Sequence, residues 1–252
     1  MTQLSVNVNK VALLRNTRTI GIPSVTKAAR MVIEAGAYGV TVHPRPDERH
    51  ITADDVDDLV ELLKEYPDIE FNIEGNPFHN LMDIVRKVRP DQATLVPDDP
   101  NAITSNQGWD IAADGERLKP IISELKDLGC RVSLFMDPDI EQIERIPESG
   151  ADRIELYTEP YAAAFEEGPE ALDRVLPLFV AAAEKAKTAG LGVNAGHDLN
   201  LDNLTPFCQN VPHVLEVSIG HALIADALDM GLKTTVEAYL HILKMTAGPV
   251  HV

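Results

Sequence analysis

The segment Gly39–His50 has the sequence GVTVHPRPDERH, and it decides how the rest of the chain is interpreted. Its first five residues alternate and include β-branched side chains, which is typical of a buried strand. No helix signal follows, and the chain continues into His43, Arg45, Arg49 and His50. Loops after parallel strands carry the chemistry of α/β proteins, and these side chains suit an anionic ligand and proton transfer near neutral pH. The alternative is a solvated loop without a specific role.

Helical patterns flank this strand on both sides. On the amino side, Ser24 can cap a helix in which apolar residues recur at i, i+3, i+4 and i+7 from Val25, and Gly36 ends it. On the carboxyl side, Thr52 can cap a second helix with the same apolar spacing, which stops before Pro67. Each apolar stripe predicts a helix that packs on a sheet.

Strand and helix patterns alternate in the same way along the whole chain. Strand patterns occur at residues 4–9, 39–43, 69–75, 92–97, 131–137, 153–158, 191–196 and 214–220. Further helical patterns occur at 77–88, 115–128, 140–146 and 201–208, in a long helix that ends at Gly190, and in two last helices at 221–231 and 234–245. Residues 10–23 are interpreted as a polar basic segment, and residues 98–111 as a long irregular insertion and candidate lid.

Eight such units predict an α/β fold with one closed (β/α)₈ barrel, a TIM barrel, in a single domain spanning residues 1–252. Parallel strands need crossover helices, and eight strand–helix units close into a barrel whose chemistry lies at the carboxyl ends of the strands. A doubly wound open sheet is the alternative. The stretch GLGVNAG at 190–196 does not indicate a dinucleotide cofactor, because its glycines precede and lie within a strand.

The composition argues against several classes of protein. Forty acidic against 22 basic residues give a formal net charge of −18, which would repel nucleic acid and an anionic membrane surface. No run approaches the roughly 18 apolar residues of a membrane span. The amino terminus, MTQLSVNVNK, lacks a signal-peptide pattern, so a cytoplasmic location is expected. Cys130 and Cys208 are too few for a disulfide framework and lack zinc-type spacing.

Polar side chains recur at the predicted strand ends, which a barrel would bring to one rim. A glutamate among basic and imidazole groups suits acid–base chemistry on a phosphorylated substrate. The members, in chain order, are Asn7, Asn9, Lys10, Arg18, His43, Arg45, His50, Glu74, Thr104, Glu155, His197, Gly220 and His221.

The motif SIGHAL at 218–223 is a candidate phosphate site. Glycine at 220 lets the backbone approach a ligand, and a helix that begins near His221 would direct free N–H groups at a phosphate. Its position after the last strand matches the usual phosphate site of such barrels. The alternatives are a glycine needed only for a tight turn, a packed histidine at His197, and a structural ion pair at Glu74.

Four motifs, SVNVNKVALLRNTR, GVTVHPRPDERHI, GVNAGHD and SIGHAL, occur in this order, and through them the chain resembles the pyridoxine 5'-phosphate synthase family over residues 4–245. The resemblance implies a (β/α)₈ barrel with extra helices, a homo-oligomer that is commonly an octamer, and no metal or organic cofactor. It also implies condensation of 3-amino-2-oxopropyl phosphate with 1-deoxy-D-xylulose 5-phosphate, which gives pyridoxine 5'-phosphate, inorganic phosphate and water.

The same resemblance implies roles for individual residues. His43 and Glu74 match the family's proton acceptors, and His197 matches its proton donor. Positions that match the aminoketone phosphate site are Asn7, Arg18, Asp198, Gly220 and His221. Positions that match the deoxyxylulose phosphate site are Asn9, Lys10, Arg45, His50 and Thr104, and Glu155 matches a further acidic position.

Two positions depart from the family pattern. The family commonly has Asp-His where this chain has Asn9-Lys10, so an acceptor and an imidazole become an amide and a fixed cation. The family also commonly has glycine where Asp198 stands, and we expect the Asp198 side chain to point away from the phosphate. From the residues alone, two other functions stay open: a phosphosugar isomerase or epimerase on the same fold, and a non-catalytic barrel that binds a phosphate ligand.

Overall fold

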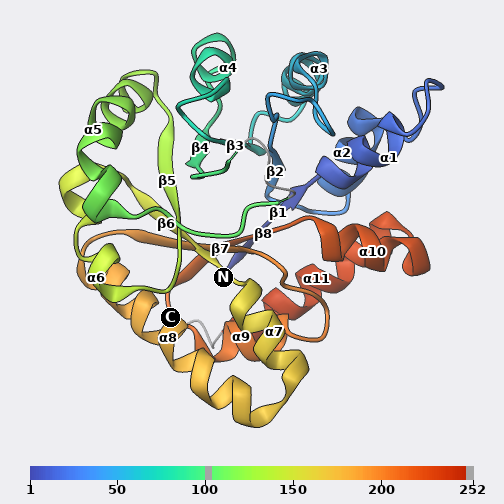
Figure 1. Cartoon of the computed structure of the whole chain (residues 1–252). Helices are drawn as coiled ribbons and strands as arrows, with labels where there is room; N and C mark the ends of the chain where they lie inside the picture. The colour runs from blue at the N-terminus through green and yellow to red at the C-terminus, as the bar shows by residue number, and fades with distance from the viewer. Residues whose placement is uncertain (100–103, 248–252) are drawn as a thin grey trace.

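The strands of the computed structural model, which describes residues 1–99 and 104–247, close into one parallel barrel (Figure 1). Each strand pairs in parallel with the next, and the last pairs with the first. The closed barrel confirms the predicted fold and excludes the open sheet. The strands are β1 (Gln3–Asn7), β2 (Gly39–Val42), β3 (Glu70–Gly75), β4 (Gln92–Leu95), β5 (Arg131–Met136), β6 (Arg153–Tyr157), β7 (Gly192–His197) and β8 (Val214–Ile219).

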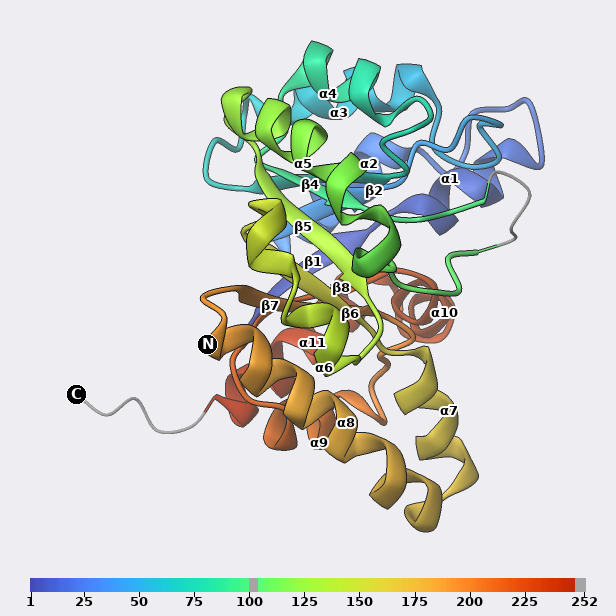
Figure 2. The same ribbon diagram turned by 60° about the vertical axis from the view of Figure 1, so that its left-hand side comes forward.

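Helices surround the barrel, with α3, α4 and α5 along one side and α8, α9 and α11 along the other (Figure 2). Their bounds are α1 (Asn9–Asn16), α2 (Val25–Glu34), α3 (Ala53–Leu63), α4 (Leu81–Val88), α5 (Ile111–Asp127), α6 (Ile140–Ile143), α7 (Glu159–Glu167), α8 (Pro169–Thr188), α9 (Leu204–Asn210), α10 (His221–Met230) and α11 (Leu232–Thr246), with a 3₁₀ turn at Ile146–Ser149. Within the described residues, none of these helices combines the length and the apolar character needed to cross a membrane.

The two helices beside β2 form for the local reasons that the sequence indicates. The Ser24 hydroxyl accepts a hydrogen bond from the Lys27 backbone N–H at 3.1 Å and caps α2. At α3, Thr52 and Asp55 form a reciprocal capping box. The apolar stripes of both helices are buried against the barrel. The Thr52 cap marks the end of the loop that carries the basic residues after β2.

The interior of the barrel is polar, whereas the strand residues that face the helices are apolar. Ser5, Thr41, Asn72 and Thr94 are fully buried and form a chain of hydrogen bonds across β1 to β4, with O–O and N–O distances of 2.7 to 3.2 Å. Side chains alternate along a strand, so residues two positions away from this layer also face the interior. On β3, the interior positions are therefore Glu70, Asn72 and Glu74, from the amino end to the carboxyl end.

Two helices were not predicted from the sequence, and a third begins earlier than expected. α1 lies within the segment interpreted as polar and basic; its apolar residues are consecutive instead of forming a stripe, and Val8 provides no side-chain cap. α7 also begins without a side-chain cap at Thr158. α5 begins at Ile111 instead of 115, because Asp110 caps it by accepting from the Ala113 N–H.

Part of the candidate lid at 98–111 lies outside the described residues, namely 100–103. The carboxyl half is held on the barrel. The buried Trp109 donates its indole N–H to the Leu95 carbonyl at 2.9 Å, and the Gly108 N–H donates to Asp137 at 3.0 Å. A side chain at Gly108 would collide with the β5 backbone, since a Cβ there would lie 2.2 Å from the Asp137 nitrogen. This half of the segment is therefore an anchored loop.

Candidate active site

A cavity of about 420 Å³ lies where the carboxyl ends of the strands meet. Its wall includes every predicted site residue except Arg18, whose side chain is exposed in the loop after α1. The structure thus brings together residues from all eight strands or the loops that follow them. The lining is Asn7, Asn9, Lys10, Leu13, His43, Arg45, Arg49, His50, Glu74, Val96, Thr104, Ser105, Phe135, Glu155, His197, Asp198, Ser218, Gly220 and His221.

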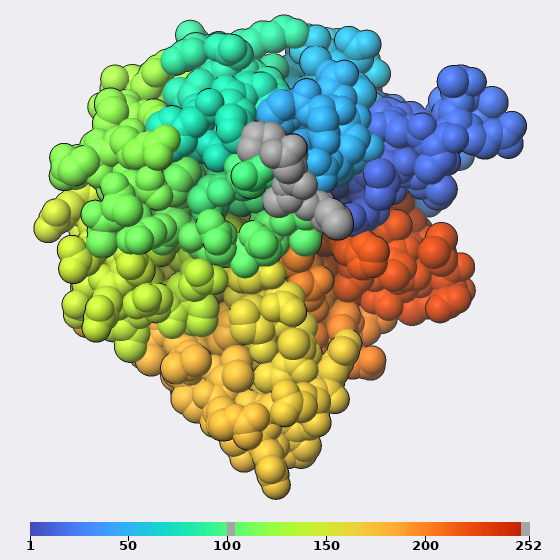
Figure 3. Space-filling view, in the orientation of Figure 1, coloured from blue at the N-terminus to red at the C-terminus, as the bar shows by residue number. Residues whose placement is uncertain are grey.

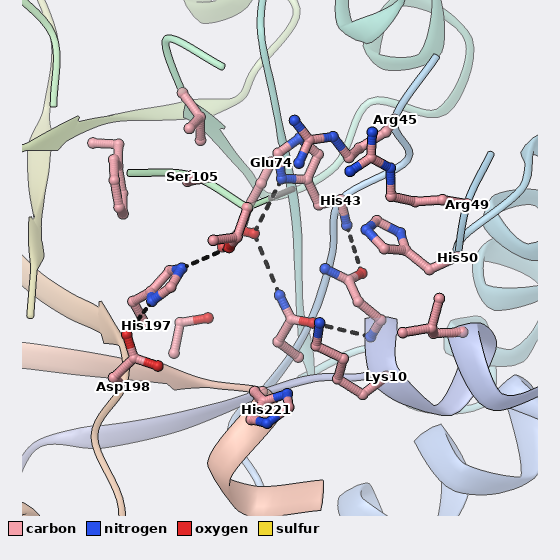
Figure 4. A pocket seen from close by; sticks show the side chains of 18 of the residues that line it. Lys10, His43, Arg45, Arg49, His50, Glu74, Ser105, His197, Asp198 and His221 are labelled. Atoms are coloured by element: carbon pink, nitrogen blue, oxygen red, sulfur yellow. Dashed lines mark hydrogen bonds and ion pairs between the residues drawn. The ribbon is translucent and has the colours of Figure 1, made fainter. Parts of the chain in front are cut away.

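Glu74 lies at the centre of this wall and joins three strands (Figure 4). Its Oε2 accepts a hydrogen bond from the Asn7 side-chain amide at 3.3 Å and lies 3.9 Å from His43 Nδ1. The Asn7 side-chain oxygen Oδ1 in turn accepts from the Asn9 backbone N–H at 3.0 Å, and the Asn9 side chain accepts from the His43 backbone N–H at 2.9 Å. These amides fix the glutamate and the histidine relative to each other.

The two glutamates of the cavity are poor anions. Burial raises the pKa of Glu74 to about 8, and the negative charges of Asp98 and Glu216 add to the effect. Burial, followed by the charge of Glu74, raises the pKa of Glu155 well above its ordinary value. Glu155 is 3% exposed, and its Oε2 has no hydrogen-bond partner among the described residues. Near pH 7 Glu74 therefore holds a proton that it can give to a bound ligand or exchange with it.

The pKa values of His43 and His50, the two histidines after β2, are lowered. Burial, with Arg45 and Arg49 nearby, lowers the pKa of His43 to about 3. Burial, with His43 and Lys10 as the next causes, lowers the pKa of His50 to about 3. Both rings are therefore neutral near pH 7, and the approach of His43 to Glu74 is not an ion pair. A neutral imidazole has a free lone pair, but the low pKa makes His43 a weak base, so it can accept a proton only where a bound anion offsets the nearby arginines.

Asp98, which the sequence does not single out, contacts two residues of the cavity wall. Its Oδ2 lies 3.2 Å from Arg45 Nη2 and 3.4 Å from His43 Nε2. Arg45 is 4% exposed and Asp98 is 8% exposed, so the pair is shielded from solvent. An anion that reaches Arg45 must compete with this carboxylate. No sequence signal marks Asp98, because it is one of several aspartates in a loop and gains its role only from its position beside β2.

At the opposite wall, His197 ends β7 with a backbone φ of 109°. Its Nδ1 hydrogen-bonds to the Asp198 carboxylate, and its Nε2 lies 2.9 Å from the Thr104 hydroxyl. The Tyr157 ring packs edge-on against the imidazole at 5.1 Å. His197 is thus oriented through both ring nitrogens and one ring edge.

Gly220 and His221 form the third part of the wall, at the start of α10. A Cβ on Gly220 would lie 3.0 Å from Asn7 Cβ, so glycine lets β8 and β1 pack closely there. No side chain caps α10, which leaves its first N–H groups directed at the cavity mouth. Such a helix start favours an anion.

The chain matches a family model over residues 4–245, and that family is described as the pyridoxal phosphate biosynthesis protein PdxJ. A relative from Albidiferax ferrireducens is 57% identical over 95% of this chain and 96% of its own length. Relatives from Xanthomonas campestris and Bacteroides fragilis are 54% and 53% identical over 96% and 97% of this chain, and 96% and 100% of their own lengths. All three are named pyridoxine 5'-phosphate synthase.

The chain belongs to the PdxJ family. The resemblance that its four motifs indicate is therefore confirmed. Distant solved structures share the barrel of this PdxJ protein. A tryptophan synthase chain from M. tuberculosis aligns with a TM-score of 0.64 at 11% identity, covering 96% of this chain and 92% of that one. A chain from Aquifex aeolicus aligns with the same score at 15% identity. These likenesses concern the fold alone.

The two departures from the family pattern both lie on the cavity wall of this PdxJ protein. Asn9 uses its side chain to hold the His43 backbone, and Lys10 faces the cavity from α1 (Figure 4). The Asp198 carboxylate turns to His197. Arg49, which stands in the basic segment but was not assigned a role, also lines the cavity.

Proposed function

We propose that this protein is a pyridoxine 5'-phosphate synthase, which condenses 3-amino-2-oxopropyl phosphate with 1-deoxy-D-xylulose 5-phosphate into pyridoxine 5'-phosphate, inorganic phosphate and water. Family membership and the names of relatives above 50% identity support this activity. The single observation that carries it in the structure is the cavity. There a protonated Glu74, a neutral His43 and an oriented His197 face one space.

Two phosphorylated substrates require two anion sites. Lys10, Arg45 and Arg49 offer cations on one side of the cavity, whereas the start of α10 at Gly220 and His221 offers backbone N–H groups on another (Figure 4). The deoxyxylulose phosphate is assigned to the first site, and the aminoketone phosphate to the second. This arrangement would place the reacting carbons of both substrates near Glu74.

Ring closure requires several proton transfers between carbons, oxygens and a nitrogen. His43 is neutral and can accept the first proton, while Glu74 has a pKa near 8 and can exchange one in either direction near neutral pH. His197 is placed to return a proton to a departing oxygen. Within residues 1–99 and 104–247, no group of three or more His, Cys, Asp or Glu side chains is arranged to hold a metal ion. We propose acid–base catalysis without a metal, as the family resemblance implies.

One assay tests this function against its two alternatives. The protein is given both substrates, with and without a chelator, and inorganic phosphate and pyridoxine 5'-phosphate are measured together. We expect both products in equal amounts, unaffected by chelator. Chelator-sensitive turnover of one substrate would show an isomerase or epimerase. Phosphate-ligand binding without product, from a folded protein, would show a non-catalytic barrel.

We also propose that the protein is a homo-oligomer, which the resemblance implies to be an octamer. α1 and α10 contact each other. Together with the loop after α1, they project from one side of the molecule (Figure 3). This projection exposes a set of large apolar side chains, which an interface would bury. They are Leu14, Ile20, Ile22, Leu228 and Met230.

In such an assembly, Arg18 would lie beside the interface and could serve a neighbouring cavity, since it does not reach its own. Mixing Arg18→Ala with Glu74→Gln protein tests this assignment. Each variant alone should be impaired, but a hybrid contains sites that combine an intact Glu74 with an intact Arg18 from the other subunit. Recovery of activity after subunit exchange is expected. Activity no higher than the sum of the two variants would place the action of Arg18 within its own subunit.

A further inference from the structure

The His197 ring is held at both nitrogens and along one edge. Asp198 contacts Nδ1, the Thr104 hydroxyl contacts Nε2, and the Tyr157 ring packs at an interplanar angle of 85° (Figure 4). The preceding residue is also constrained, because a Cβ at Gly196 would lie 2.5 Å from the Glu155 carboxyl oxygen. The backbone φ of His197 is 109°, a value that residues with a side chain rarely adopt. The contacts around His197 therefore hold it in this conformation.

The two contacts together determine where the neutral ring carries its proton. An ionised carboxylate can only accept hydrogen bonds, so Nδ1 must donate to Asp198. Nε2 is then left with a lone pair. The Thr104 hydroxyl can donate a hydrogen bond to this lone pair, and its oxygen lies 2.9 Å from Nε2. The nitrogen with the lone pair is therefore the one on the side of the cavity where Thr104 stands.

We propose that Asp198 is a positioning residue for His197, which keeps a proton on Nδ1 so that Nε2 exchanges protons with the substrate. This inference rests on the proposed function. Nε2 first takes a proton from the substrate in an earlier transfer, and when it gives this proton up, the Nε2–H bond breaks and an O–H bond forms on the departing oxygen. The ring is left neutral, with its remaining proton on Nδ1 facing Asp198. Thr104 occupies Nε2 until a substrate oxygen replaces it.

The carboxylate is better suited to this role than to holding a phosphate. Like charges repel, and the Asp198 oxygen nearest the ring is already occupied by Nδ1. The Asp198 side chain is 34% exposed and that of His197 is 23% exposed, so solvent weakens the interaction. Loss of one charge-assisted hydrogen bond in this setting corresponds to a decrease in kcat of about tenfold.

Nuclear magnetic resonance of the resting protein tests the tautomer directly. Protein labelled with ¹⁵N-histidine is observed by long-range proton–nitrogen correlation, and the His197 signals are assigned from the His197→Asn variant. We expect a protonated Nδ1 and an unprotonated Nε2. In Asp198→Ala we expect the Nε2–H form to gain population, and in Asp198→Glu, which keeps a carboxylate, we expect the Nδ1–H form to be largely retained. A resting protein with its proton on Nε2 would overturn the proposal.

Kinetics then separate positioning from phosphate binding. In Asp198→Ala, kcat should fall about tenfold while KM for both substrates stays within twofold, and Asp198→Glu should recover part of the loss. Asp202→Asn is the matched control, since Asp202 is an exposed aspartate in the same β7–α9 loop and is not on the cavity wall. Thermal unfolding confirms that each variant is folded. A raised KM with unchanged kcat would assign Asp198 to substrate binding and reject the proposal. Absence of product from the unaltered protein would reject the proposed function alone, because the tautomer is read without substrate.

Discussion

The two glutamates at opposite ends of β3 show how one residue type serves two purposes in the same barrel. Glu70, at the amino end, is 5% exposed and pairs with Arg131, and the neighbouring Glu216 lies 3.1 Å from Arg153. Among the described residues, no arginine offsets the charge of Glu74, four residues on, which contacts an amide and a neutral imidazole. At the amino end, Arg153 and Arg131 partly offset the burial of Glu216, although its pKa is still raised to about 8, whereas the charges that act on Glu74 at the carboxyl end all raise its pKa further. Burying a carboxyl group without an opposite charge lowers the stability of the fold, and a catalytic role for that group accounts for its presence.

The largest expected effect is on turnover when the carboxyl-end glutamate is changed. Glu74→Gln keeps the shape of the side chain but removes its exchangeable proton, so kcat should fall by about 10³. Product formation from both substrates is the measurement, with a fluorescence or circular dichroism spectrum to confirm folding. Glu70→Gln is the matched control on the same strand, and its kcat should stay within threefold of the original. Equal losses of kcat in the two variants would show that the ends of β3 do not differ in function.

The second effect concerns stability at the amino end. Glu70→Gln leaves Arg131 with a weaker partner in a partly buried network, which also includes Glu216. Because Arg131 is 27% exposed, water compensates part of the loss, and we expect a decrease in the free energy of unfolding of about 2 kcal/mol. Urea unfolding at pH 7 measures it. The exposed pair of Arg174 and Glu167 provides the control. Arg174→Met should lower the free energy of unfolding by less than about 1 kcal/mol. A Glu70→Gln variant as stable as the original would mean that the amino-end pairs add no net stability.

The third expected effect is a gain in stability, in Glu74→Gln, and its size depends on pH. The pKa of Glu74 is about 8 in the folded protein and near 4.5 when unfolded, so the folded state holds the proton more tightly. Its contribution to stability is therefore full below pH 4.5 and is lost as the pH rises towards 8. Glu74→Gln removes this loss. Relative to the original protein, the variant should gain about 4 kcal/mol at pH 8 and almost nothing at pH 4.5. A gain that is the same at both pH values would disprove the assigned titration.

Much of this comparison could be anticipated from the sequence. The alternating strand patterns predict the barrel, and the barrel places His43, Glu74, His197 and Gly220 at one rim because all parallel strands end there. The family motifs added roles to these positions. Strand alternation also contains an unused signal: Glu70, Arg131, Arg153 and Glu216 stand at or near the starts of strands that face the interior, so the amino-end network could have been inferred.

What the sequence did not provide depends on contacts between distant segments. Asp98 gains its role from lying beside Arg45, 53 positions earlier in the chain, and no local pattern marks it. α1 has no capping side chain and no apolar stripe, so its existence follows from packing against the barrel and α10. The orientation of Asp198 depends on the unusual backbone at His197. The position of Arg18 outside its own cavity likewise requires the three-dimensional path of the loop after α1.

The smallest expected effect concerns how the carboxyl-end cations are held in place. Asn16, at the end of α1, donates its side-chain amide to the carbonyls of the basic loop, at 2.8 Å to His50 and 3.2 Å to Arg49. Its neighbour Arg15 pairs with Asp55 and so ties α1 to α3. These contacts reach the backbone and not the ligand, and an ordinary hydrogen bond contributes about 1 kcal/mol. Asn16→Ala should therefore raise KM for the deoxyxylulose phosphate about fivefold and leave kcat and the KM of the aminoketone nearly unchanged.

Steady-state kinetics with each substrate varied in turn measures this difference between the two anion sites. The control is Asn210→Ala, which removes an exposed side-chain hydrogen bond to the Pro206 carbonyl on α9, away from the cavity wall. If Asn16→Ala raised KM for both substrates equally, the basic loop would act on the whole cavity and not on one phosphate site. A selective increase would show that the brace from α1 shapes only the cationic site, while the start of α10 holds the other phosphate independently. The two anion sites would then differ in the same way as the two ends of β3, because each anion site would have its own structural support.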